Sequence, residues 1–160
     1  MRLHLNRDIK LFLSATLLYG FSFSIWELFY NLYILSLGFN SDTLGLVRSA
    51  APLAALILGL PLGILSDRIG RRKSMVLGLG TCFLGMFLQI QLAQPGLIFL
   101  FGLVQGAGLM LYHVSQPPFI MAASREEDQA MVFSLNFGLL TLAAMKTELI
   151  KLLPGIDIFI

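Results

Sequence analysis

The chain has 160 residues, of which 57% are hydrophobic and only 12% are charged, and its formal net charge is +2. Soluble domains carry about 25% charged residues, so this chain has too little charge to cover a water-facing surface. The composition therefore predicts an all-α, multi-pass transmembrane helix bundle surrounded by a lipid bilayer. The small net charge predicts no nucleic-acid partner, and a single cysteine excludes an internal disulfide.

The first ten residues, 1–10, form a polar and basic amino-terminal segment, and a long apolar run follows them. The run continues to about Leu37, so it is longer than the apolar part of a signal peptide, which has about 7–15 residues. No small-residue cleavage site ends the run. We therefore interpret it as the first spanning helix.

Five apolar stretches are long enough to cross a bilayer, which takes about 20 residues. Turn residues or charge clusters separate them, as in "LGFNSD", "AQPG" and "ASREEDQ". The predicted spans are residues 11–37, 43–65, 74–93, 96–120 and 129–153. They form one transmembrane helical domain, 11–153, followed by a tail, 154–160. Charged residues interrupt the fifth stretch, so we expect its helix to fray beyond about Ala144.

Lysine and arginine are distributed unevenly over the ends of these spans. The amino terminus, the second loop and the fourth loop together hold eight of them, whereas the first and third loops hold none. In membrane proteins the cytoplasmic loops carry the excess of Lys and Arg. We therefore predict a protein of the cell membrane with a cytoplasmic amino terminus and, after five spans, a carboxyl end outside.

Polar residues in the first span lie on one helical face. Gly20, Ser24, Glu27 and Asn31 recur at spacings of four, three and four. An ionisable group inside a membrane is costly and is a functional hypothesis by default, so Glu27 and Asn31 are candidate substrate or proton contacts. The alternative is that Glu27 lies near the outer surface and is merely hydrated.

The second loop, "GILSDRIGRRKS", holds four of the eleven Lys and Arg. A plain basic anchor explains those four but not Asp67, which needs a partner because a helix carboxyl end carries partial negative charge. Arg71 is close to it in sequence. Gly63 would let a neighbouring helix approach closely, and Gly70 allows a sharp turn. We interpret the loop as a docking device between helices, with the basic anchor as the alternative.

In the fourth span, Gln105 lies near the middle, with Gly102 and Gly106 beside it. Small residues at a spacing of four indicate close helix packing, which is the interpretation we favour here. A substrate or proton contact by Gln105 is the alternative. No metal-ligand cluster, nucleophile triad or phosphate-binding glycine loop stands in the sequence, so we expect no metal, no cofactor and no enzymatic activity.

The second loop resembles the signature loop of the major facilitator superfamily, G-x-L-a-D-r-x-G-r-r/k, which that family also has between its second and third spans. The matching residues are Gly63, Leu65, Asp67, Arg68, Gly70, Arg71 and Arg72. The stretch "GLVQGAGLM" resembles the family's fourth-helix pattern R-x-x-q-G-x-g-a at Gln105, Gly106 and Gly108, but Gly102 stands where the pattern has Arg.

The resemblance implies a secondary transporter that moves a small-molecule substrate by alternating access, with twelve helices in two halves and the substrate bound between them. It implies that Gly63, Asp67, Arg68, Gly70, Arg71 and Arg72 form a cytoplasmic gating loop. The five spans correspond to part of the amino-terminal half, so we expect the carboxyl-terminal half as a partner. The alternative is a small membrane protein that does not transport, either an assembly partner or a truncated remnant.

Overall fold

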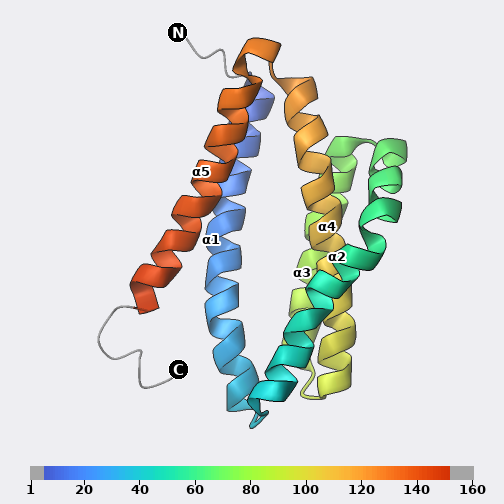
Figure 1. The fold of residues 1–160 in the computed structure, drawn as a ribbon, viewed down its shortest axis with the longest axis vertical. Coiled ribbons are helices and arrows are strands. Elements are labelled where there is room, and N and C mark those ends of the chain that lie inside the picture. Colours follow the sequence, from blue (N-terminus) through green and yellow to red (C-terminus); the bar gives the residue numbers. More distant parts are fainter. Residues whose placement is uncertain (1–5, 152–160) are drawn as a thin grey trace. The chain divides into compact units, whose positions relative to one another are not determined.

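The computed structural model describes residues 6–151, and it describes side chains for residues 6–145. Within that range the chain forms helices only, with no strand (Figure 1). The helices are α1 (Arg7–Ser36), α2 (Ser41–Ile69), α3 (Arg71–Gln91), α4 (Pro95–Ala123) and α5 (Glu126–Lys151). All five are long and apolar enough to cross a membrane. The predicted all-α, multi-pass membrane protein is therefore confirmed.

Several helices are longer than the spans predicted for them. α2 continues to Ile69, past the expected end near Leu65, and α4 continues to Ala123, past the expected end near Ile120. The backbone of α5 is helical as far as Lys151, but the described side chains end at Met145, so fraying beyond Ala144 stays a prediction. The predicted tail, 154–160, lies outside the described residues.

Local chemistry explains where the helices begin and end. Gly38, with φ +78°, turns the chain between α1 and α2. The Asn40 side chain caps α2 by accepting from the backbone N–H of Thr43 at 3.0 Å. Pro95 is the first residue of α4, where its missing N–H costs nothing. α5 opens with three acidic residues, which suit the positive end of its helix dipole.

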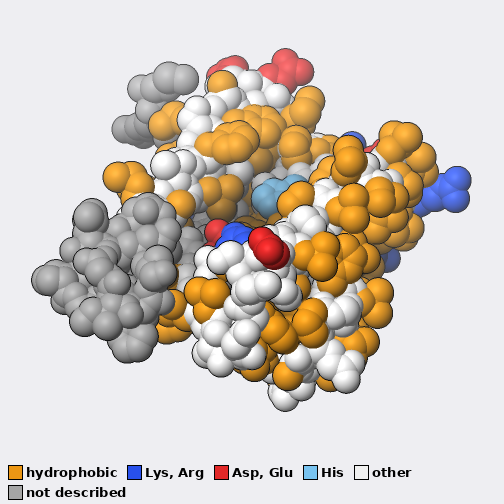
Figure 2. Space-filling model, turned by 60° about the horizontal axis from the view of Figure 1, so that its bottom comes forward, with side chains coloured by type: hydrophobic (Ala, Val, Ile, Leu, Met, Phe, Trp, Pro, Cys, Tyr) orange, Lys and Arg blue, Asp and Glu red, His pale blue; other side chains and the backbone are white. Residues whose placement is uncertain are grey.

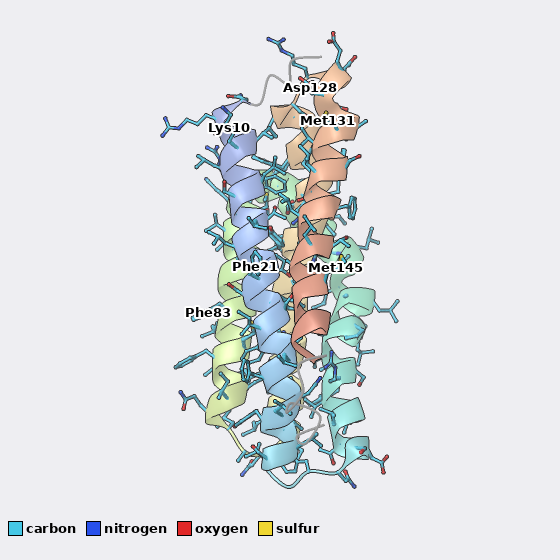
Figure 3. All side chains as sticks on the ribbon, turned by 90° about the vertical axis from the view of Figure 1, so that its left-hand side faces the viewer. Lys10, Phe21, Phe83, Asp128, Met131 and Met145 are labelled. Atoms are coloured by element: carbon cyan, nitrogen blue, oxygen red, sulfur yellow. The ribbon has the colours of Figure 1, made fainter. Side chains whose placement is uncertain are left out.

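Large apolar side chains are exposed along the helices, as the orange surface of Figure 2 shows. Leu56 is 82% exposed and Leu60 79%, and Phe83, which points away from α3 in Figure 3, is 70% exposed. A soluble protein rarely exposes contiguous apolar surface on this scale. Lipid chains are the solvent that these side chains require.

The chain divides into two compact units, each described here by itself. The first unit contains α1, the end of α4 from Ile120, and α5. In it α1 and α5 lie side by side (Figure 1). They run in the same direction, because Lys10 and Asp128, near their first residues, lie at one end in Figure 3. A buried hydrogen bond joins them, with Thr16 Oγ1 donating to Asn136 Oδ1 at 3.1 Å.

The second unit contains α2, α3 and α4 up to Phe119. Buried residues on α3 that include Ser74, Gly78, Cys82 and Gly85 recur at spacings of four, four and three, which places them on one face. A Cβ added at Gly78 would lie 2.7 Å from the carbonyl oxygen of Gly108 in α4. The backbones of α3 and α4 are therefore in direct contact, as is common where small residues line a membrane helix.

Candidate functional site

The signature loop is a single-residue turn between two helices. α2 ends at Ile69 and α3 begins at Arg71, so only Gly70 is non-helical. Asp67 and Arg68 therefore lie in the last turn of α2, and Arg71 opens the first turn of α3. The sequence predicts the residues of this turn but not how short it is, because the pattern does not mark helix ends.

Gly70 adopts φ +91° and ψ 139°, a backbone conformation that is unfavourable for any residue with a Cβ atom. Its N–H donates to the carbonyl of Ser66, and its own carbonyl accepts from the N–H of Ser74, both at 3.0 Å. The Ser74 hydroxyl also donates to the Gly70 carbonyl, at 3.0 Å. The predicted sharp turn at Gly70 is confirmed, and its polar backbone groups are bonded on both sides.

Arg71 does not pair with Asp67. Its Nη1 donates instead to the carbonyl oxygen of Pro118 in α4, at 2.9 Å. Asp67 is exposed, and among the described residues its carboxylate has no hydrogen-bond or ion-pair partner. An acid at the negative end of α2 is thus left uncompensated within residues 6–145.

No neighbouring helix lies close to Gly63 among the described residues. A Cβ added there would meet nothing within 4 Å among the described residues, whereas one at Gly106 would meet the backbone of Ala51 at 2.5 Å. No helix among the described residues makes the close approach expected at Gly63, so a contact there stays a prediction. The close approaches occur on α3 and α4 instead.

The polar face of α1 meets α5 at Gly20, where an added Cβ would lie 2.9 Å from the Cβ of Ala143. Two turns further along this face Glu27 is exposed, and Asn31 is partly exposed. Both residues take part in interactions within the structure. Glu27 and Asn31 belong to the first unit, and Gln105 belongs to the second.

Gln105 is engaged in helix packing. Gln89 Nε2 in α3 donates to Gln105 Oε1 at 2.7 Å, and this bond is buried. A Cβ added at Gly85 would lie 2.6 Å from the backbone nitrogen of Gln105. The packing interpretation thus has direct support, and Gln89 is the partner that the sequence pattern did not reveal.

Gly102 and Gly106 are in contact with α2, as their spacing predicted. A Cβ added at Gly102 would lie 2.8 Å from the Cβ of Ala50. The signature pattern has Arg at the position of Gly102, and this contact leaves no room for a side chain there. The departure from the pattern therefore accompanies a tight contact between α2 and α4.

Three buried polar features escaped the sequence analysis. Thr16 bonds Asn136 between α1 and α5, and the hydroxyls of Ser66 and Ser115 lie 2.8 Å apart. Gln116 is 5% exposed, and its Nε2 has no hydrogen-bond partner among the described residues. Isolated polar residues in apolar helices carry no periodic signal, so only the contact between helices identifies their partners.

Within residues 6–145, no group of His, Cys, Asp and Glu could hold a metal ion.

Comparison with known proteins gives one match. The family model described as Major Facilitator Superfamily matches residues 11–146, which is most of the chain. No curated protein and no solved structure matches.

Proposed function

Since the chain belongs to the major facilitator superfamily, a family of membrane transporters, we propose that it moves a small solute across the cell membrane by alternating access. In this mechanism the substrate site opens to one side of the membrane at a time, and helices on the closed side must make and break contacts. The α2–α3 turn supplies such contacts. The gating loop is formed by Gly63, Asp67, Arg68, Gly70, Arg71 and Arg72.

The observation that supports the proposal is that Asp67 is exposed and has no interaction partner among the described residues. Its carboxylate is exposed at the end of α2 and has no partner in residues 6–145, although four basic residues lie within six positions of it. A charge held in this way at a rigid turn suits a contact that forms only in one conformation. We infer that its partner is a cation or a helix amino end in a carboxyl-terminal half of the transporter.

The orientation follows from the distribution of basic residues. The α2–α3 turn and the amino terminus are rich in Lys and Arg, so we place both in the cytoplasm. The spans 11–37, 43–65, 74–93, 96–120 and 129–153 then cross the bilayer alternately. Within them, we assign Glu27 and Asn31 as substrate or proton contacts, and Gln105 to the helix contact that supports the site.

Uptake into proteoliposomes tests the proposal. The purified protein is reconstituted, and entry of labelled solutes is followed with one sugar, one amino acid, one organic acid and one organic cation. We expect at least one class to enter faster than into protein-free liposomes, and Asp67→Asn to slow that entry. Uptake of every class at the protein-free rate would instead support the alternative, a membrane protein that assembles with others and does not transport.

A further inference from the structure

Two hydrogen bonds join α4 to the α2–α3 turn. Arg71 Nη1 donates to the carbonyl of Pro118 at 2.9 Å, and the hydroxyls of Ser66 and Ser115 lie 2.8 Å apart. Ser115 and Pro118 are three residues apart, so they lie on neighbouring parts of one α4 face. Ser66 and Arg71 stand on either side of Gly70. The two bonds therefore fasten both flanks of the turn to α4.

The direction of the serine bond is fixed by counting protons. The Ser115 hydroxyl donates to the carbonyl of Leu111 at 2.7 Å. A hydroxyl has only one proton to donate, so the Ser66 hydroxyl must be the donor to Ser115 Oγ. Ser66 is 3% exposed and Ser115 is fully buried. A hydrogen bond shielded from water in this way is stronger than an exposed one.

The Arg71 bond reaches α4 at its weakest point. Pro117 and Pro118 have no N–H, so α4 lacks the ladder bonds that would end on the carbonyls of His113 and Val114. A helix bends most readily where ladder bonds are missing. A donor from another helix that holds the carbonyl of Pro118 restrains this segment.

The acceptor is a neutral carbonyl, so the positive charge of Arg71 is not cancelled by the bond. The bond nevertheless commits the guanidinium to α4 rather than to Asp67. The same contact that restrains α4 thereby leaves the Asp67 carboxylate available to a partner outside the described residues.

We propose that Arg71 is a positioning residue which, together with the Ser66–Ser115 pair, clamps the double-proline segment of α4 to the α2–α3 turn. The ends of α2, α3 and α4 at this turn then move as one body when the transporter changes state. Only this last step rests on the proposed function, because the clamp itself is a property of the folded chain.

Hydrogen–deuterium exchange of the full chain in lipid nanodiscs tests the clamp. The segment followed is 115–124, which contains the end of α4. Arg71→Met removes the donor at similar length, and we expect deuterium uptake in this segment to become several-fold faster. Lys73→Met is the matched control, because it removes the same charge from the same turn but breaks no bond to α4; uptake should stay at the native rate. Arg71→Lys should give most of the protection seen in the native protein, because the lysine ammonium group can also donate one hydrogen bond to the Pro118 carbonyl.

A native exchange rate in Arg71→Met would overturn the proposal, and so would equal acceleration in Arg71→Met and Lys73→Met, which would reduce Arg71 to one charge among several. Should Arg71→Met fail to insert, the double variant Ser66→Ala/Ser115→Ala removes the second bond and leaves no orphan hydroxyl. It should also speed exchange in segment 115–124, and a native rate there would contradict the clamp. Exchange is measured without any solute, so its outcome is independent of the uptake experiment.

Discussion

Single glycines decide how closely the helices of the second unit approach, and the obstacle differs between two neighbouring positions. A Cβ at Gly102 would meet a side chain, the Cβ of Ala50, at 2.8 Å. A Cβ at Gly106 would meet backbone atoms of Ala51 at 2.5 Å. A side-chain obstacle can be removed by a second substitution, whereas a backbone obstacle cannot.

We therefore predict that Gly102→Ala and Gly106→Ala each lower the free energy of unfolding by about 1–3 kcal/mol, as overpacking does elsewhere. Ala50→Gly should restore most of the loss in Gly102→Ala, whereas Ala51→Gly should not rescue Gly106→Ala. The measurement is a double-mutant cycle for each pair, from unfolding in mixed micelles titrated with a denaturing detergent. Equal rescue in both pairs would show that α2 shifts freely.

Glu27 is a candidate contact for the substrate or for a coupling proton. If it binds substrate or a coupling proton, Glu27→Gln should abolish solute uptake and leave membrane insertion intact, because the amide keeps the shape of the side chain and loses its charge. Asp42→Asn is the control, since it makes the same chemical change at an exposed position in the first turn of α2. Native uptake by Glu27→Gln would reduce Glu27 to a hydrated group near the outer surface.

At the scale of elements, the α2–α3 turn separates two glycines of the same signature. Gly70 has φ +91°, whereas Gly63 lies inside α2 with nothing within 4 Å of an added Cβ among the described residues. Gly70→Ala should destabilise the protein by about 1–3 kcal/mol because of backbone strain. Gly63→Ala should be neutral or stabilise it by up to about 1 kcal/mol, since alanine favours the helix.

The same detergent titration gives both values, and destabilisation by Gly63→Ala would mean that α2 is packed more tightly than the structure shows. Uptake adds a distinction that stability does not make. A stable Gly63→Ala protein with impaired uptake would place the contact of Gly63 in the partner half. Unimpaired uptake would remove Gly63 from the gating loop.

Elements also show what the sequence was able to predict. Long apolar stretches and the basic turn indicated five helices and their family, because both signals are local in sequence. The spacing of Gly102 and Gly106 predicted a helix contact correctly. The partner of Arg71 was not predicted: Asp67 is the nearest opposite charge in sequence, whereas the acceptor in the structure is the Pro118 carbonyl. A backbone acceptor 47 residues away leaves no mark in a sequence pattern.

At the scale of the whole molecule, the proposed transport mechanism requires each turn to face a particular side of the membrane. The gating role of Asp67 and the excess of basic residues both require the α2–α3 turn in the cytoplasm. The α1–α2 turn then lies outside. If the orientation were reversed, the loop would face the wrong compartment for both, whereas the contacts of Arg71 with α4 would be unaffected.

The most direct test is therefore thiol labelling of intact cells with a charged, membrane-impermeant reagent, in a Cys82→Ala background. Ser41→Cys reports on the α1–α2 turn and Lys73→Cys on the α2–α3 turn, since both positions are exposed in the structure, whereas Ser66 is buried and unsuitable as a probe. We predict that Ser41→Cys is labelled in intact cells and that Lys73→Cys is labelled only after the membrane is permeabilised. Labelling of Lys73→Cys from outside intact cells would contradict the account.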